Sequence, residues 1–412
     1  MNQFTIKIYK NMSNTSQSSD PSAVIDQKAR ATVGLTTIPP RCGLNVISLF
    51  SGGGGLDLGL EAAGFQTHFE NDIDPYSCST LKMGRLAAVK RGLSIFCNSV
   101  VLDADVKSLE GKFVLESSRL RKGGVSLLAG GPPCQAFSVF GNRKGRGDHR
   151  GQLVYEYFRL LSQISPEAFL FENVYGLLTV ENGAVFKMAC EQLKEPRKGL
   201  RYELSVLRLN AANYGVPQFR DRIFIIGSRK GKTIKEIDAL TVDPRHHIRP
   251  SQLPFRTVKD ALRGLPKPND KFPANHTGRS HSDRIIKRYG SMVAGQRDNY
   301  TRINKLDLTK PSYTIIVGSD KGGGKGHIHP IAPREVSPRE SARIQTFPDW
   351  WEFAGTGRHP IRQVGNAVPP LLGFAVANAL REQIFGLSTI SIKAAVETLS
   401  QQHLFPEWFK SR

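Results

Sequence analysis

The sequence lacks the features that mark secreted and membrane proteins. Its 412 residues contain five cysteines, an odd number, and no two of them form a Cys-x-x-Cys pair. That usage argues against a disulfide scaffold and a structural zinc site, and it predicts a reducing compartment. No apolar run approaches the roughly 20 residues that cross a bilayer, and residues 1–41 lack the apolar core of a signal peptide. We therefore expect a cytoplasmic protein without membrane association.

Acidic residues are scarce beside basic ones. Asp and Glu number 36 against 57 Lys and Arg, which gives a formal net charge of +21. A protein this basic usually meets a polyanion, with nucleic acid as the first candidate and an anionic membrane surface as the second. A merely basic enzyme remains the plainer alternative, because net charge reports on partners and not on fold.

Two common ligand motifs are also missing. No GxxxxGK[ST] phosphate loop occurs, since Lys321-Gly-Gly-Gly-Lys325 lacks its spacing and its Ser or Thr. We expect no metal site, because the histidines of the basic region lack the spacing of metal ligands; they are His246, His247, His276, His281, His327 and His329.

Strand-like and helix-like segments alternate from residue 44 onward. Strands are predicted over residues 44–50, 65–70, 125–129, 168–171, 201–209 and 222–227. Helices are predicted over residues 56–63, from Pro75, and over 151–164, 338–345 (with Ser337 as N-cap and Glu340 completing a capping box) and 369–385. This alternation predicts an α/β fold with a mostly parallel sheet covered on both faces. Functional residues should then gather at the carboxyl ends of the strands.

Changes in composition and hydrophobic periodicity divide the chain into five parts. Residues 1–41 are rich in Asn, Ser, Thr and Gln and are expected to form a disordered leader. Residues 42–229 should form the first part of the main domain. Residues 230–330 are basic, rich in Pro and weakly periodic, which indicates a separate loop-rich domain. Residues 331–388 should return to the main domain, and 389–412 are left as a C-terminal extension.

A glycine-rich turn follows the first predicted strand. Phe50-Ser-Gly-Gly-Gly-Gly55 lets the backbone approach a ligand closely, although a tight turn without a ligand is nearly as plausible. Asp72 ends the second strand about 20 residues later, where an acid can bind ribose hydroxyls. Asp105 offers another acid, suited to an adenine amino group. The pattern favours a cofactor that has adenosine but no phosphates.

The strongest single signal is Gly130-Gly-Pro-Pro-Cys134 at the end of a strand. Two prolines stiffen the approach to the cysteine, and the basic, Gly-rich residues 141–150 could form a loop that closes on a polyanion. A reactive thiol needs a partly exposed, electropositive setting, which this segment provides. The alternative is a buried structural thiol on a Pro-rich turn.

A carboxyl and two arginines complete the predicted site. Glu172 ends the strand after that of Cys134, and adjacent parallel strands would bring the two together for proton transfer; a helix-capping role is the alternative. Arg220 and Arg222 lie two apart on an extended segment, so they point the same way. They could reach phosphate or base oxygens together, or could simply pair with Asp221 and Glu203.

Nine motifs in this order resemble the bacterial cytosine-5 DNA methyltransferase family, of the type II restriction–modification type. The resemblance runs from about residue 44 to 385, and no single motif carries it. The motifs are Phe50-Ser-Gly-Gly-Gly-Gly, Asp72-Ile-Asp-Pro, Asp105-Val, Gly-Pro-Pro-Cys134-Gln, Arg150-Gly-Gln-Leu153, Glu172-Asn-Val, Gln218-Phe-Arg-Asp-Arg222, Arg339-Glu-Ser-Ala-Arg-Ile-Gln-Thr-Phe-Pro348 and Gln363-Val-Gly-Asn366-Ala-Val-Pro.

The resemblance implies a Rossmann-like, S-adenosylmethionine-dependent methyltransferase domain and a smaller target-recognition domain at residues 230–330. It implies that Asp72 binds the ribose, Asp105 the adenine amino group, and Ile73 the adenine face. The full set of implied cofactor residues is Phe50, Gly52, Gly54, Gly55, Asp72, Ile73, Asp105, Val106, Pro133, Leu153, Asn366 and Val368.

The resemblance also implies a mechanism on double-stranded DNA. Cys134 would attack carbon 6 of a flipped-out cytosine, Glu172 would protonate or hydrogen-bond ring nitrogen 3, Arg222 would hold oxygen 2, and Arg220 would support the site or a phosphate. Implied DNA contacts are Gln135, Ser138, Arg143, Lys144 and Gln218. Candidate base readers in the insert are Arg245, His247, Arg249, Arg279, Arg297 and Arg302, which the sequence does not rank.

Three other functions stay open at this point. They are a cytosine-5 transferase acting on RNA, a sequence-specific DNA-binding protein without catalysis, and an oxidoreductase that uses NAD. The large basic insert argues against an RNA substrate. The joint presence of Cys134, Glu172 and Arg222 argues against a protein that has no catalytic activity. An oxidoreductase that uses NAD would leave Cys134 and Glu172 without a role. We expect a monomer in the bacterial cytoplasm, associated with the nucleoid through DNA and functionally paired with a restriction endonuclease.

Overall fold

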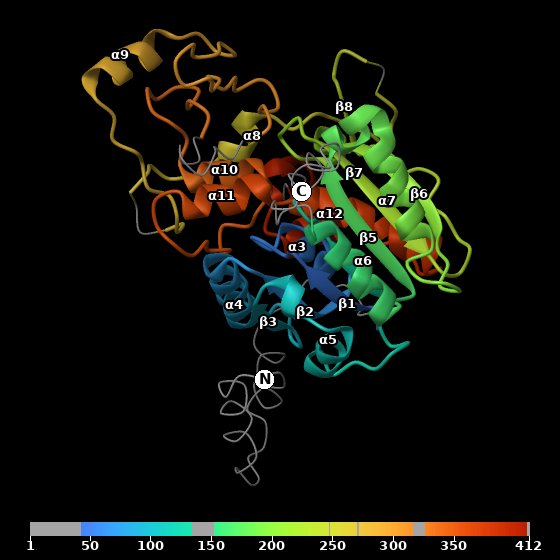
Figure 1. Ribbon diagram of the computed structural model, residues 1–412. Coiled ribbons are helices and arrows are strands. Elements are labelled where there is room, and N and C mark those ends of the chain that lie inside the picture. Colours follow the sequence, from blue (N-terminus) through green and yellow to red (C-terminus); the bar gives the residue numbers. More distant parts are fainter. Residues whose placement is uncertain (1–42, 134–151, 247, 270–271, 316–325, 410–412) are drawn as a thin grey trace, which may run out of the picture.

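The computed structural model describes residues 43–133, 152–246, 248–269, 272–315 and 326–409. Its centre is a seven-stranded sheet with the strand order β3-β2-β1-β4-β5-β7-β6 (Figure 1). The strands are β1 (Asn45–Leu49), β2 (Gln66–Asp72), β3 (Val100–Asp103), β4 (Leu127–Gly130), β5 (Ala168–Val174), β6 (Glu203–Asn210) and β7 (Asp221–Ser228). The predicted α/β fold is confirmed, although the sequence reading missed β3.

One strand of the sheet runs against the others. β7 pairs antiparallel with both β5 and β6, whereas the remaining neighbours are parallel. Only residues 211–220 join β6 to β7, and they include the short 3-10 helix η5 (Ala211–Tyr214). A parallel crossover needs a dozen or more residues, so this short connection forces an antiparallel return.

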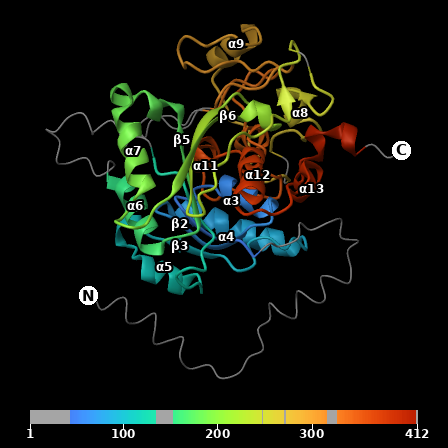
Figure 2. The same cartoon turned by 90° about the vertical axis from the view of Figure 1, so that its right-hand side faces the viewer.

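Helices cover both faces of the sheet (Figure 2). One face carries α3 (Gly55–Ala62), α4 (Pro75–Lys90) and α12 (Pro370–Ala379), and the other carries α5 (Gly111–Ser117), α6 (Gln152–Ile164) and α7 (Ala184–Lys194). Successive residues of a strand point to opposite faces of the sheet. Val46 therefore belongs to the hydrophobic cluster on one face, and Ile47 belongs to the cluster on the other. Short 3-10 helices lie at η1 (Val106–Ser108), η3 (Tyr175–Leu178) and η4 (Val180–Gly183).

The C-terminal part of the chain is built into the main core. A Cβ atom on Gly59 of α3 would lie 2.5 Å from the backbone nitrogen of Phe374, so α3 and α12 pack backbone against backbone. The predicted helix over residues 369–385 is α12 followed by the π-helical turn η6 (Leu380–Ile384). The sequence suggested that this is the last helix of the chain, and that expectation was wrong. Three further helical segments follow it, namely α13 (Ile392–Thr398), η7 (Gln402–Leu404) and η8 (Pro406–Trp408). Val396 and Phe405 are fully buried.

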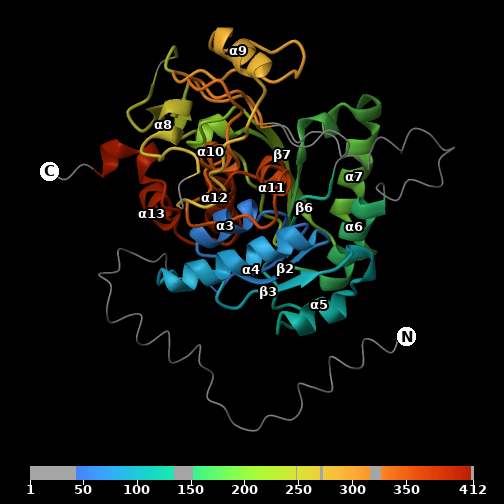
Figure 3. The ribbon, with the colours of Figure 1, turned by 90° about the vertical axis from the view of Figure 1, so that its left-hand side faces the viewer.

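The insert rises from the sheet, with α9 as its outermost helix (Figure 3). Its described elements are β8 (Thr241–Val242), β9 (Leu253–Pro254), α8 (Val258–Leu262) and α9 (Asp283–Ser291), before α10 (Pro338–Ile344) and α11 (His359–Asn366) return to the main body. α9 has a small core of its own, formed by Tyr289, Met292, Ile303 and Ile328. The predicted capping box of Ser337 and Glu340 at α10 is confirmed.

Every helix within the described ranges is too short or too polar to span a lipid bilayer. Nor do the described His, Cys, Asp and Glu residues form a group of three that could hold a metal ion.

Candidate active site

The glycine-rich turn after β1 is hydrogen-bonded to the side chain of Asp72. The backbone N–H of Gly52 donates to Asp72 Oδ2 at 2.8 Å, and the N–H of Asp74 donates to Oδ1 at 2.9 Å. Gly52 has a φ of 54° and Phe50 a φ of 56°, and a Cβ on Gly52 would approach nothing closer than the Phe50 carbonyl at 4.0 Å. Burial raises the pKa of Asp72, and the two backbone donors oppose that rise. The turn thus leaves a backbone surface open beside an acid.

The last two glycines of the turn, Gly54 and Gly55, are packed against protein atoms. A Cβ on Gly54 would lie 2.7 Å from the Trp351 ring, and one on Gly55 would lie 2.1 Å from the Val368 carbonyl oxygen. Trp351 is fully buried and donates from Nε1 to the Gly53 carbonyl at 2.9 Å. Protein atoms fill the Cβ side of Gly54 and Gly55, so their predicted contact with the cofactor would come from the backbone and stays a prediction.

Other predicted cofactor residues lie at the ends of β2 and β3 and beyond α11. Ile73 is 65% exposed although it is a large aliphatic residue, and Asn366 is exposed at the end of α11. Asp105 caps η1, with Oδ1 accepting from the Lys107 N–H at 3.0 Å. Val106 is 3% exposed and its side chain packs in the second hydrophobic cluster, while its predicted contact with the cofactor stays a prediction.

The remaining members of that predicted set differ in exposure. Pro133 is exposed and Leu153 is half-buried at the start of α6. Val368 is 6% exposed, and it meets the glycine turn through its carbonyl rather than its side chain.

Polar contacts tie α11 to the end of β2. Thr80 Oγ1 donates to Gln363 Oε1 at 2.6 Å, and Arg362 pairs with Asp74 at 3.1 Å. These links bring residues near 366 to the same edge as Asp72. Nothing in the sequence spacing signals them, since more than 280 residues separate Thr80 from Gln363.

A buried ion pair stands at the carboxyl end of β5. Glu172 Oε1 lies 2.8 Å from Arg222 Nε, and the two side chains are 11% and 10% exposed. Arg222 also donates from Nη1 to the Asp221 backbone carbonyl at 2.7 Å. Burial raises the pKa of Glu172, while the charges of Arg222 and Arg220 oppose the rise. The alternative pairing of Arg222 with the side chains of Asp221 or Glu203 is not what the structure shows.

The segment that leads to Cys134 lies against this pair. β4 and β5 are adjacent and parallel, as the sequence predicted. A Cβ on Gly131 would lie 2.6 Å from Glu172 Oε2, and Asn173 donates from Nδ2 to the Pro132 carbonyl at 3.0 Å. Asn173 thereby positions the approach to Cys134, a role that the sequence reading did not assign. Cys134, Gln135, Ser138, Arg143 and Lys144 themselves lie outside the described residues.

Gln218 and Arg220, two earlier residues of the motif that ends at Arg222, face inward. Arg220 is 1% exposed and donates from Nη2 to the carbonyls of Gly365 and Ala367, at 2.8 and 2.9 Å. It cannot reach a phosphate, so that part of its prediction is wrong; it joins β7 to α11. Gln218 is fully buried and hydrogen-bonds to Gln345 at 3.1 Å. A DNA contact by the Gln218 side chain is therefore excluded in this conformation.

Two of the described cysteines are poor nucleophiles. Burial raises the pKa of Cys78 to about 12 and that of Cys190 to about 11. The reactive form of a cysteine is the thiolate, so both thiols stay protonated and unreactive near neutral pH.

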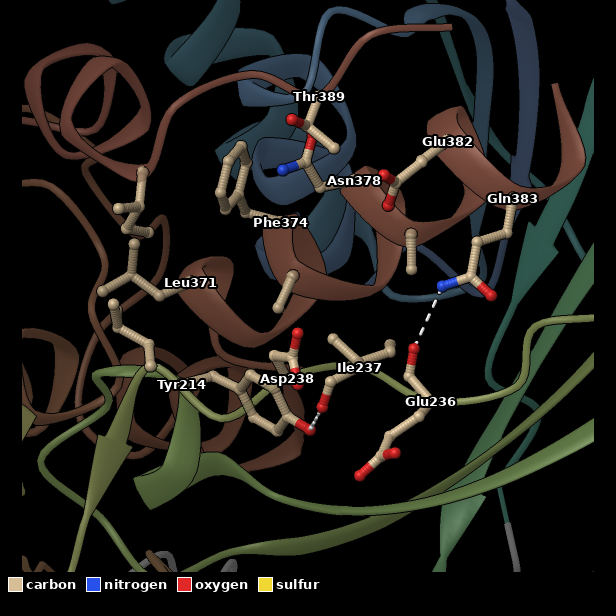
Figure 4. A pocket seen from close by; sticks show the side chains of 14 residues that line it. Tyr214, Glu236, Ile237, Asp238, Leu371, Phe374, Asn378, Glu382, Gln383 and Thr389 are labelled. Atoms are coloured by element: carbon tan, nitrogen blue, oxygen red, sulfur yellow. Dashed lines mark hydrogen bonds between the residues drawn. The ribbon is translucent and has the colours of Figure 1, made fainter. Parts of the chain in front are cut away.

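A separate pocket of about 250 Å³ lies between α12 and residues 236–240 (Figure 4). Phe374 and Leu371 give it an apolar side, and Glu236, Asp238 and Glu382 also line it. None of the predicted site residues lines this pocket, so it is distinct from the edge where Asp72 and Glu172 lie.

Comparison with known proteins assigns the chain to a family. The family model for the C-5 cytosine-specific DNA methylases matches residues 44–382. The type II methyltransferase M.AquIA of Picosynechococcus is 37% identical over 231 residues, covering 54% of this chain and 88% of the relative. M.XorII of Xanthomonas oryzae is 32% identical over 374 residues, covering 82% of this chain and 84% of the relative.

Solved structures agree. A DNA modification methyltransferase encoded within an E. coli prophage superposes with a TM-score of 0.64 at 29% identity, covering 83% of this chain and 99% of the other. S. pombe Dnmt2 shares the fold at a TM-score of 0.57 and 17% identity, covering 82% and 98% of the two chains. This chain combines the strand order described above with a glycine turn above Asp72 and the paired Glu172 and Arg222. It belongs to the C-5 cytosine-specific DNA methylase family and is a DNA cytosine-5 methyltransferase.

Proposed function

We propose that this enzyme methylates carbon 5 of a flipped-out cytosine within one specific duplex DNA sequence, through a covalent Cys134 adduct. We further propose that the mark protects DNA from a partner restriction endonuclease. The observation that carries the chemistry is the buried Glu172–Arg222 pair, 2.8 Å apart, beside Gly131 on the segment that leads to Cys134.

Cytosine carbon 5 is a weak nucleophile until the ring is activated. The Cys134 thiolate adds to carbon 6, and the electron pair of the ring moves toward nitrogen 3. Glu172 is placed to protonate or hydrogen-bond that nitrogen, and its burial keeps a proton on the carboxyl to higher pH than in water. After carbon 5 is methylated, a base removes its proton and the carbon–sulfur bond breaks to restore the ring.

Arg222 and Arg220 have different roles in this scheme. Arg222 holds Glu172 through Nε and donates from Nη1 to the Asp221 carbonyl, so Nη2 would be the nitrogen that holds cytosine oxygen 2. Arg220 acts through α11, since its Nη2 donates to Gly365 and Ala367. Arg220 is therefore a positioning residue in this scheme, not one that touches the base.

The open turn at Gly52 fits an adenosine cofactor without phosphates. Asp72 faces it as a ribose acceptor, Ile73 offers an exposed apolar surface for the adenine face, and Asp105 is fixed at the end of the next strand. S-adenosylmethionine bound there would supply an electrophilic methyl group to carbon 5. We propose that Phe50, Gly52 and Asn366 complete its surroundings.

Ile73→Ala is expected to weaken S-adenosylmethionine binding about tenfold, because it removes apolar surface that the adenine would cover. Titration calorimetry measures the dissociation constant directly. Leu86→Ala is the matched control, since Leu86 is 61% exposed on α4 and lies outside the proposed site. Equal affinities for the two variants would remove Ile73 from the cofactor site.

Duplex DNA is the proposed partner because of the formal net charge of +21 and the large basic insert. We expect affinity to fall steeply with salt as Lys and Arg release phosphate counterions. We propose that a monomer suffices, since the insert supplies its own recognition surface. An RNA substrate is the second possibility.

Bisulfite sequencing of plasmid DNA from cells that express the enzyme tests the whole proposal. Conversion-resistant cytosines at one recurring short sequence, absent from cells with a Cys134→Ser variant, are the expected result. Full conversion of plasmid DNA beside folded protein would contradict it, and the same measurement on cellular RNA would then identify an RNA enzyme.

A further inference from the structure

A hairpin of the insert, residues 295–305, is closed by its own backbone. The N–H of Gly295 donates to the Lys305 carbonyl at 2.8 Å, and the N–H of Lys305 donates to the Gln296 carbonyl at 2.8 Å. Closer to the tip, the Asp298 N–H donates to the Ile303 carbonyl at 2.8 Å. We call residues 295–305 the insert hairpin.

Two buried charges fix the insert hairpin to α9. Lys305 is 7% exposed, and its ammonium donates to the carbonyls of Tyr289 and Met292 at 3.1 and 2.9 Å, where the helix ends. Asp298 is 4% exposed; it accepts from the Thr301 N–H at 2.8 Å and lies 3.1 Å from Arg288 Nε. A buried charge is stable only when it is paired, so these contacts define one conformation for the tip.

The tip presents an aromatic ring and an arginine to solvent. Tyr300 is 82% exposed, and the guanidinium of Arg288 lies 4.8 Å from its ring centroid. Arg302 is exposed with a φ of 62°, in the left-handed region that side chains other than glycine rarely adopt. Such strain costs free energy and is kept mostly where function requires it.

The contacts also rank the arginines of the insert that the sequence left equal. Arg245 donates from Nε to Asp243 Oδ1 and from Nη2 to Asp243 Oδ2, and Arg279 pairs with Glu335 at 3.2 Å. Arg297 donates from Nε to the Arg302 carbonyl at 3.1 Å and so braces the tip. Within the described ranges neither the Arg302 nor the Arg249 guanidinium has a carboxylate partner. Arg302 differs from Arg249 because it lies on the fixed tip of the insert hairpin.

We propose that the insert hairpin enters the major groove of the target DNA, where Arg302 reads a guanine and the Tyr300 ring packs on the adjoining base pair. This rests on the proposed function of sequence-specific DNA methylation. The major groove admits a two-stranded ribbon, and a bidentate arginine on guanine O6 and N7 is the commonest specific contact there. Neither Tyr300 nor its pairing with Arg288 was signalled by the sequence.

Arg302→Gly is the sharpest test, because it removes the guanidinium and also relieves the left-handed backbone strain. Once the target sequence is known from bisulfite sequencing, kcat/KM is measured on duplexes with each base pair replaced in turn. Arg302→Gly should lose discrimination at one G·C pair by roughly 5- to 150-fold, with Tm unchanged to within about 3 °C. Tyr300→Ala should lower kcat/KM on the target at least about fivefold.

Arg284→Ala is the matched control, since Arg284 is an exposed arginine of α9 outside the insert hairpin, and it should keep wild-type discrimination. If the wild-type enzyme methylates DNA but Arg302→Gly still discriminates at every position, the hairpin proposal is wrong. An equal loss on all sequences would mean a phosphate contact and would overturn base reading by Arg302. A wild-type enzyme that methylates no DNA would instead overturn the proposed function.

Discussion

Cys134→Ser is expected to lower the rate of methyl transfer by at least about 10⁴-fold, because a serine hydroxyl stays protonated near neutral pH and does not add to carbon 6. Transfer of a labelled methyl group to duplex DNA measures the loss. Duplexes with 5-fluorocytosine at the target should trap the wild-type enzyme covalently, since fluorine replaces the proton that must leave. The Cys134→Ser variant should form no such adduct.

Cys190→Ser is the control for that substitution. Cys190 lies on α7, and burial raises the pKa of its thiol to about 11, so it has no thiolate to lose. It should keep wild-type turnover. Full turnover by Cys134→Ser, with Cys190→Ser also active, would exclude the covalent scheme.

Glu172→Gln is expected to lower kcat by about 10²- to 10⁴-fold while the affinity for S-adenosylmethionine is unchanged. The amide keeps the shape of the side chain but has no proton to give to ring nitrogen 3. Burial raises the pKa of Glu172 in the folded enzyme. The protonated form therefore persists to higher pH than in water, and a rate that needs it should fall as the pH rises through that raised pKa. The residual rate of Glu172→Gln should lack this alkaline fall.

Glu167→Gln provides the matched comparison, because Glu167 precedes the opposite end of β5 and pairs with Lys230. It should leave kcat and the pH profile as in the wild type. If Glu172→Gln retains the wild-type rate and alkaline fall, another group must stabilise nitrogen 3, and Glu172 holds Arg222 in place only.

Local sequence signals predicted those features of the fold that depend on near neighbours. Alternating apolar segments located six of the seven strands of the sheet, and the capping box at Ser337 located α10. The direction of β7 was not predicted, although the shortness of residues 211–220 was visible. α13 has seven residues, as α10 has, but it was missed because no capping box marks its start.

The motifs by themselves predicted the family, which is confirmed. They also singled out Cys134 and Glu172 as the proposed catalytic residues, because a motif is a run of near neighbours that can be read from the sequence alone. Tertiary structure decided which motif residues point into the candidate active site and which point into the protein interior. Arg220 and Arg222 look alike in sequence, yet one reaches back to α11 and the other pairs with Glu172. Gln218 is buried against α10, and Gly55 is a glycine because the Val368 carbonyl fills its Cβ position. These outcomes depend on contacts between residues 50 or more positions apart in the chain, which no local pattern records.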